Sequence, residues 1–437
     1  MRINLTSIII FILKFYLFNC LYPEDFDHDI YDRPVLKYVR EHDDPLIPSN
    51  PVIFVPGFGG SQLEAKLTNK PSRVHYLCDT TTSDYYDIWL DLKQFVTYFI
   101  DCFVDNMRMV INKSTRKCEN SPGVDIRTPG NFGNNTDVVE WLDTVHFSQA
   151  SYFAPIANAL VSWGYIRGKN IQAAPYDWRL KPTDMEDYYL KLKQVIIKTS
   201  ELNNNSKVVF IAHSMGNVHL NYFLRNYVDK PFIDKYIQSH IALAAPWAGS
   251  MQIVKLLVSG YNMEFYRILL PPSSLRSMQR TWGSSYLLFP REPAWKKDEV
   301  FAFGPYNNYS LNNVKDFFKD LNFMEGYDQY VESLTNTYKV MNVPDVETHC
   351  INGVGIDTPD IYGWSKSYYP DYQPDYSKIG DGDGTVNKKS LDICRMWSKL
   401  SPIVTVNEVN KTDHISILSS SVTIKLIKEK LYKNMKY

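Results

Sequence analysis

Lys207–Asn217 reads KVVFIAHSMGN, and this stretch decides the fold. Its first half, Val208–Ala212, is a short apolar run rich in β-branched residues, which is typical of a parallel strand buried on both faces. Apolar residues at helical spacing follow in Val218–Tyr227. A strand, one tight turn and a helix, with a serine in the turn, form the context of the G-x-S-x-G nucleophile elbow. Ser214 is therefore the predicted nucleophile, although an ordinary strand-to-helix turn is the alternative.

The elbow departs from its motif at one position, where Ala212 replaces the first glycine. Alanine is still small enough for a helix and a strand to approach closely, so the departure is mild.

An earlier apolar strand at Pro51–Val55 runs into the glycine-rich loop Pro56–Gly60. In hydrolases with such an elbow, this loop and the residue after the nucleophile each supply a backbone N–H to the oxyanion hole. The predicted donors are Phe58 and Met215.

The order serine, acid, histidine along the chain selects the remaining members of a catalytic triad. Only two of the nine histidines, His349 and His414, come late in the chain. His414 alone lies beyond the acidic turn predicted at Lys378–Asn387, so it is the predicted base, with a plain surface histidine as the alternative. The acid should end a strand that precedes this base, which leaves Asp381 and Asp383. A base accepts the proton of the weakly nucleophilic serine hydroxyl, and a carboxylate fixes the tautomer of the base.

Composition and the acidic turn exclude several other functions. A net charge of −1 over 437 residues, without a basic stripe, argues against a nucleic-acid partner. The D-x-D-G pattern at Asp381 resembles a calcium loop, but the downstream glutamate of the EF-hand is absent. No metal ion or other cofactor is predicted.

The N-terminus directs the chain into the secretory pathway. The apolar run Ile8–Leu17 is too short for a comfortable membrane span, so residues 1–21 are predicted to be a signal peptide, with an uncleaved anchor as the alternative. Five cysteines remain after Cys20, an odd number that implies two disulfides and one leftover thiol in an oxidising compartment. Five sequons predict N-glycosylation; they lie at Asn112, Asn134, Asn204, Asn308 and Asn410.

Residues 22–437 are predicted to form one α/β domain, with a mostly parallel sheet, helices on both faces and two insertions. The first insertion, at about residues 72–105, is rich in aromatic residues and is a candidate membrane-docking segment. Its predicted docking residues are Tyr85, Tyr86, Trp89 and Phe95, although the same rings could simply pack on the core. The second insertion, at about residues 250–345, fits a mobile apolar lid over a lipid site, and a static cap fits nearly as well.

Seven sequence blocks, in order along the chain, resemble the lecithin:cholesterol acyltransferase and lysosomal phospholipase A(2) family. The blocks are VPGFGGSQLEAKL, YYDIWLDL, AAPYDWRL, AHSMGN, LAAPWAGS, VFAFGPYNNY and GDGDGTVNKKSL. The resemblance runs from about Asn50 to the last helix and implies the α/β-hydrolase fold. It places the triad on Ser214, Asp383 and His414. It also implies the disulfides Cys78–Cys102 and Cys350–Cys394, which leave Cys118 unpaired.

AHSMGN and GDGDGTVN are more similar to the lysosomal branch than to the plasma branch that esterifies cholesterol. Phe58 departs from both, because it stands where the lysosomal branch has aspartate and the plasma branch has cysteine. The resemblance implies a calcium-independent serine phospholipase A and O-acyltransferase. It would transfer an acyl chain from a glycerophospholipid, through a Ser214 acyl-enzyme, to water or to a lipid alcohol such as ceramide.

The expected partner of such a protein is a phospholipid membrane or lipoprotein surface, and the expected location is the lysosome or the extracellular space. A monomer is expected. The first alternative is a secreted phosphatidylcholine-sterol O-acyltransferase. The second, from another class, is a non-catalytic lipid-binding protein on the hydrolase fold.

Overall fold

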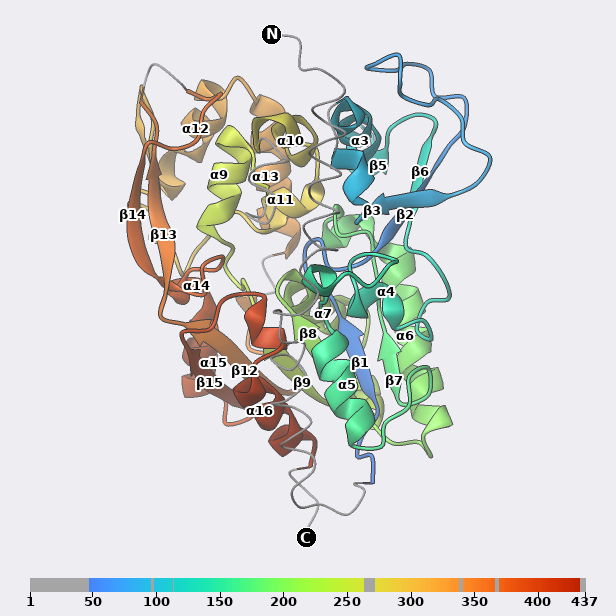
Figure 1. The fold of residues 1–437 in the computed structure, drawn as a ribbon. Coiled ribbons are helices and arrows are strands. Elements are labelled where there is room, and N and C mark those ends of the chain that lie inside the picture. Colours follow the sequence, from blue (N-terminus) through green and yellow to red (C-terminus); the bar gives the residue numbers. More distant parts are fainter. Residues whose placement is uncertain are drawn as a thin grey trace, which may run out of the picture. The chain divides into compact units, whose positions relative to one another are not determined.

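The computed structural model describes residues 47–95, 98–112, 114–262, 272–337, 341–365 and 369–432. The signal peptide predicted at residues 1–21 lies outside these ranges. Figure 1 shows the arrangement of the elements along the chain.

A six-stranded parallel sheet forms the centre of this structure. In spatial order its strands are β15 (Val404–Asn410), β12 (Glu347–Val354), β9 (Ile237–Leu243), β8 (Val208–His213), β1 (Val52–Val55) and β7 (Ile171–Ala173). The nucleophile strand β8 lies between β9 and β1, and every one of its residues is buried. Its continuous apolar run is explained by this burial on both faces. The predicted α/β fold with a largely parallel sheet is confirmed.

Helices cover both faces of the central sheet. They are α5 (Ala154–Ser162), α6 (Glu186–Leu202), α7 (Met215–Asn226), α8 (Lys230–Tyr236), α15 (Ile393–Leu400) and α16 (Ser421–Leu431). Because successive strand side chains point to opposite faces, Ile53 and Phe210 share one core with residues of α6 and α7. On the other face Phe54 stacks on Phe153 just before α5, with ring centroids 4.6 Å apart. There α5 and α16 lie side by side, and the Trp163 and Tyr432 rings at their ends meet edge to face.

A second sheet of four strands contains the acidic segment. Its spatial order is β11 (Asn308–Tyr309), β10 (Ala302–Phe303), β13 (Ile356–Gly363) and β14 (Tyr376–Gly382). The turn predicted at Lys378–Asn387 is therefore wrong in its first half, because Lys378–Gly382 pair antiparallel with β13. Glycine and aspartate are depleted in strands, so local propensity hid this strand. Asp383 follows β14 directly.

The described part of the second insertion is a packed cap. Its helices are α9 (Met251–Ser259), α10 (Pro272–Gln279), α11 (Gly283–Leu287), α12 (Val314–Asp320) and α13 (Met324–Thr337). Buried rings hold them together; Phe289, for example, contacts both Phe301 and Phe318. Residues 263–271 of this insertion, which the lid prediction includes, lie outside the described residues.

The first insertion combines a small sheet with helices. Its strand β3 (Tyr86–Trp89) pairs with β2 (Leu63–Leu67), which precedes the insertion and also pairs with β6 (Val124–Arg127). The hairpin β4 (Met109–Ile111) and β5 (Cys118–Asn120) lies between β3 and β6 in the chain. The helices are η1 (Leu92–Phe95) and α3 (Phe99–Met107). Figure 1 shows this insertion and the cap beyond the carboxyl ends of β1 and β8. Both predicted disulfides are present, Cys78–Cys102 in this insertion and Cys350–Cys394 between β12 and α15. Among the described helices, none has the length and apolar character that a membrane crossing needs.

Candidate active site

Ser214 occupies a strained turn between β8 and α7. Its backbone φ is 53°, in the left-handed region that side chains other than glycine rarely adopt. The turn is compact because α7 approaches β1 closely at Gly216. A Cβ atom on Gly216 would lie 2.3 Å from the Pro56 carbonyl oxygen and 2.5 Å from that of Val55. Only glycine fits there, so the last glycine of the motif has a steric reason that the first position, Ala212, does not share.

Asn217 supports the turn from within α7. Its side-chain amide donates to the carbonyl oxygens of Ser214, at 2.9 Å, and Leu243, at 3.0 Å. Its oxygen must therefore accept from the Nε2–H of His240, which lies 2.9 Å away. All of these groups are buried. The final asparagine of AHSMGN thus ties the elbow to the neighbouring strand β9.

The three predicted triad residues meet in one hydrogen-bonded chain. His414 Nε2 lies 2.9 Å from Ser214 Oγ, and His414 Nδ1 lies 2.7 Å from Asp383 Oδ2. The backbone N–H of His414 also donates to the Asp383 carbonyl at 2.9 Å. Ser214 and His414 are each 7% exposed and Asp383 is 1% exposed, so the chain is shielded but reachable.

The structure distinguishes the two aspartates that the sequence left open. Asp383 Oδ1 accepts the backbone N–H groups of Thr385 and Val386, at 3.0 and 2.6 Å, which fixes the carboxylate with Oδ2 toward His414. Asp381 is exposed, and its Oδ1 accepts from the Gly355 N–H instead. The geometry therefore brings Asp383 to the histidine, as the resemblance implied.

Backbone N–H groups also converge beside Ser214. Gly57 abuts the nucleophile, since a Cβ on Gly57 would lie 2.7 Å from Ser214 Cβ. The Gly57 N–H already donates to the Tyr152 hydroxyl at 3.0 Å. Phe58 and Met215 are the next N–H groups on either side, and among the described residues neither N–H has a backbone acceptor. This leaves the two predicted oxyanion donors open to a ligand.

Two buried residues that the sequence analysis did not assign adjoin this site. The Tyr152 hydroxyl lies 2.5 Å from His213 Nδ1, and His213 Nε2 lies 2.8 Å from the His414 carbonyl oxygen. His213 precedes the nucleophile, but nothing in the sequence links it to Tyr152, 61 residues earlier. Only the fold brings this pair together.

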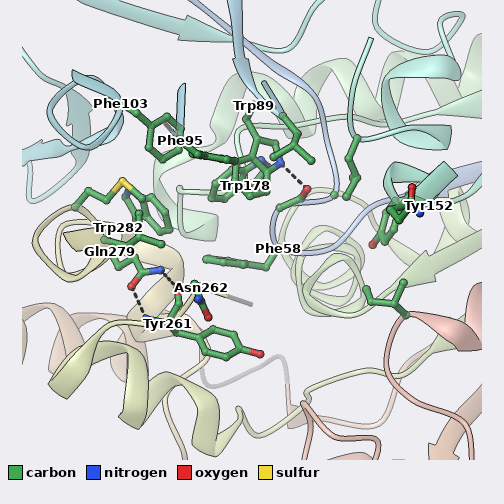
Figure 2. A pocket seen from close by; sticks show the side chains of 18 of the residues that line it. Phe58, Trp89, Phe95, Phe103, Tyr152, Trp178, Tyr261, Asn262, Gln279 and Trp282 are labelled. Atoms are coloured by element: carbon green, nitrogen blue, oxygen red, sulfur yellow. Dashed lines mark hydrogen bonds between the residues drawn. The ribbon is translucent and has the colours of Figure 1, made fainter. Parts of the chain in front are cut away.

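An apolar cavity begins next to the residues that flank the triad. Phe58 and Ile415, the chain neighbours of Gly57 and His414, both line it. Figure 2 shows the rings of Phe58, Trp178 and Trp282 gathered on one side and Tyr152 on the other. The Phe58 ring centroid lies 5.1 Å from that of Trp178 and 5.7 Å from that of Trp282. Such a space accepts a long apolar group next to a reactive hydroxyl.

The aromatic residues predicted to dock on membranes lie mostly inward. Phe95 is 3% exposed, so its buried ring contradicts the predicted docking role. Trp89 donates its indole N–H to the Gly59 carbonyl at 2.8 Å and packs on Trp178, which makes it a wall of the cavity. Tyr86 is half-buried and accepts from Asn106, while the hydroxyl of the half-buried Tyr85 donates to Asp125. The aromatic content of the segment did not distinguish these inward rings from outward ones.

Other apolar side chains of the first insertion are exposed instead. They are Val74, Tyr76, Leu77, Leu92, Tyr98 and Phe99, which we call the outer apolar set.

The thiol of Cys118 is free and buried, and burial raises its pKa to about 12. Of the five sequon asparagines, Asn112 is half-buried; the other four are exposed, at Asn134, Asn204, Asn308 and Asn410. Glycosylation stays a prediction.

The family model described as lecithin:cholesterol acyltransferase matches residues 85–341 and 327–429 of the chain. The chain belongs to this family. It is 39% identical to the human lysosomal phospholipase A and acyltransferase over 89% of this chain and 92% of that protein. It is 36% identical to the chicken phosphatidylcholine-sterol acyltransferase over 94% of each chain. Among solved structures, the Tle4–Tli4 complex is similar over 89% of this chain, with a TM-score of 0.49 and 12% identity, a distant likeness.

Three buried histidines predict that acid destabilises the protein. Burial lowers the pKa of His219 and of His240 to about 3, and that of His213 well below 6.5. Below pH about 6.5 the unfolded chain therefore binds protons that the folded chain does not. The free energy of unfolding should fall by up to about 1.4 kcal/mol per pH unit for each histidine as the pH drops further.

Urea denaturation of the wild type and of His219→Gln at pH 7.5, 6.5, 5.5 and 4.5 measures this effect. The variant is expected to lose roughly 2–3 kcal/mol less than the wild type between pH 6.5 and 4.5, because it lacks one of the three protonations. Parallel pH dependences for the two proteins would contradict the assignment of His219.

Proposed function

We propose that this protein is a serine phospholipase A and O-acyltransferase that acts on glycerophospholipids. The observation that carries the proposal is the hydrogen-bonded triad Ser214–His414–Asp383, with an apolar cavity that is lined by Ile415, the residue after His414. The proposal is supported by family membership and by relatives named as phospholipase and acyltransferase. A non-catalytic lipid-binding protein would not need this ordered set of polar groups.

Acylation follows from the positions of the groups. His414 Nε2 takes the Ser214 proton as Oγ attacks the ester carbonyl carbon, and Asp383 stabilises the imidazolium that forms. The N–H groups of Phe58 and Met215 would hold the oxyanion, an interaction worth on the order of 100-fold in rate for each donor. His414 then returns the proton to the departing lysophospholipid oxygen. The acyl chain stays on Ser214 and extends into the cavity.

Deacylation uses the same groups in the opposite direction. His414 removes a proton from the acceptor hydroxyl, which attacks the acyl-enzyme carbonyl, and Ser214 leaves with that proton. Water as acceptor gives phospholipase A activity, and a lipid alcohol such as ceramide gives transacylation. Sterol as acceptor is a second candidate, supported by the similarity to the phosphatidylcholine-sterol acyltransferase.

The substrate surface would be a phospholipid membrane or lipoprotein, in the lysosome or outside the cell. The outer apolar set supports contact with such a surface, because exposed apolar side chains clustered in one insertion are typical of interaction sites. The name of the human relative supports the lysosome. The second insertion would contribute to substrate binding, since its residues Leu275 and Met278 line the cavity.

The first test is covalent labelling and turnover. A fluorophosphonate probe should label the wild type but not Ser214→Ala. Phosphatidylcholine vesicles that contain ceramide and cholesterol together, at pH 5 and pH 7.5, should yield free fatty acid, acylceramide or sterol ester with the wild type only. A folded wild type that neither reacts with the probe nor releases fatty acid would refute the proposed enzyme.

The two aspartates give a matched pair of variants for the triad. Asp383→Asn should lower kcat by about 10⁴-fold, because the amide no longer holds the imidazole in the reactive tautomer. Asp381→Asn changes the same chemistry two residues away on an exposed side chain and should keep activity within about twofold. Hydrolysis of a soluble p-nitrophenyl ester measures both. Equal losses in the two variants would mean that the acid has been assigned to the wrong residue.

The outer apolar set predicts where vesicles bind. Tyr76→Ser and Phe99→Ser should each weaken vesicle binding by about tenfold, since each removes a ring worth about 1.5 kcal/mol or more when it enters lipid. Hydrolysis of the soluble ester should not change. Leu400→Ser, which alters a side chain that is 75% exposed at the end of α15, is the control and should bind vesicles normally. If all three variants sedimented with vesicles as the wild type does, the outer apolar set would not be part of the docking surface.

A further inference from the structure

We propose that Tyr152 and His213 are positioning residues that hold the His414 base and the Gly57 loop in fixed positions relative to each other. This inference rests on the proposed function and adds two residues to its site. The two residues form one buried chain of hydrogen bonds that runs from the Gly57 N–H to the His414 carbonyl oxygen.

The direction of every hydrogen bond in this chain is determined by its ends. A carbonyl oxygen only accepts, so His213 Nε2 must carry the proton that it shares with His414. His213 Nδ1 is then the acceptor in the neutral ring, and the Tyr152 hydroxyl must donate to it. The same hydroxyl oxygen accepts the Gly57 N–H. Each of the three hydrogen bonds therefore has one donor and one acceptor, and a neutral His213 ring allows no other assignment.

These hydrogen bonds are stable because both side chains are buried. Tyr152 is 3% exposed and His213 is 1% exposed, so water does not replace either partner. Burial and the neighbouring His414 hold the pKa of His213 well below its usual range, while burial raises that of the Tyr152 hydroxyl. Both groups thus stay neutral, and the tautomer of His213 does not change with pH across the working range.

Both ends of the chain bear directly on the proposed chemistry. At one end, His414 is held at its N–H by the Asp383 carbonyl and at its own carbonyl by His213, so its backbone is clamped on both sides. At the other end, Gly57 directly precedes Phe58, whose N–H is the proposed oxyanion donor. Removal of the Tyr152 hydroxyl frees the Gly57 N–H directly, and it leaves His213 Nδ1 without the donor that orients the His213 ring toward the His414 carbonyl. A displacement of about 1 Å at either group is enough to lower a rate by about 100-fold.

The molecule supplies a matched control in another buried tyrosine–histidine pair. Tyr189 on α6 lies with its hydroxyl 2.9 Å from His219 Nδ1 on α7, and both residues are fully buried. Neither residue contacts the triad. Tyr189→Phe therefore reports the loss of a comparable hydrogen bond in the core, one that is made neither to Gly57 nor to His414.

The test compares Tyr152→Phe, His213→Gln, their double variant and Tyr189→Phe in the full chain. We measure kcat and KM for a soluble p-nitrophenyl ester, the rate of fluorophosphonate labelling, and the melting temperature. Tyr152→Phe should lower kcat and the labelling rate by about 10–100-fold, keep KM within twofold, and melt at a temperature close to that of Tyr189→Phe. The double variant should be no slower than the slower single variant, because the two residues act in one chain.

Three results would overturn the inference. They are a kcat of Tyr152→Phe equal to that of Tyr189→Phe, a loss that appears in KM alone, and losses that multiply in the double variant. Should Tyr152→Phe not fold, His213→Gln carries the same comparison with the same three measurements. An inactive, unlabelled wild type would instead refute the proposed function, so the two failures are distinguishable.

Discussion

The close approach of α7 to β1 at Gly216 is the contact on which the rest of the site depends. With no side chain at this position, the helix lies against the carbonyl oxygens of Val55 and Pro56, and the chain turns within a single residue. The cost is a left-handed backbone at Ser214. Three constraints offset this cost: the Ser214 N–H donates to the Leu243 carbonyl, Asn217 ties the turn to β9, and the buried strand β8 fixes the backbone that enters the turn. Strain and support together hold Oγ within hydrogen-bond distance of His414.

The partners of Ser214 come from separate layers of the fold. The base lies in the loop after β15, at one edge of the central sheet, whereas the acid follows β14 of the second sheet. The His414 backbone joins these layers, since its N–H binds Asp383 and its carbonyl binds His213 at the end of β8. Relative motion of the two sheets is therefore resisted at His414, the proposed base, by hydrogen bonds to both sheets.

How much the sequence predicted depended on whether a feature is local. The elbow, its strand and its helix lie in consecutive residues, and the order of serine, acid and histidine follows from chain direction, so these predictions match the structure. The strand β14 was missed because its glycines and aspartates oppose strand propensity and only pairing with β13 stabilises them. Phe95 and Trp89 were misplaced because an aromatic ring has the same sequence signal whether it faces lipid or a cavity. Tyr152 and His213 were missed because a pair 61 residues apart leaves no pattern.

Phe58 shows why catalysis and substrate choice are coupled in this site. Its backbone N–H is a proposed oxyanion donor, while its ring packs on Trp178 and Trp282 in the cavity wall. The position of the N–H is therefore set partly by the packing of the ring. An acyl chain that displaces the ring also moves the donor, so chain shape must affect rate as well as binding.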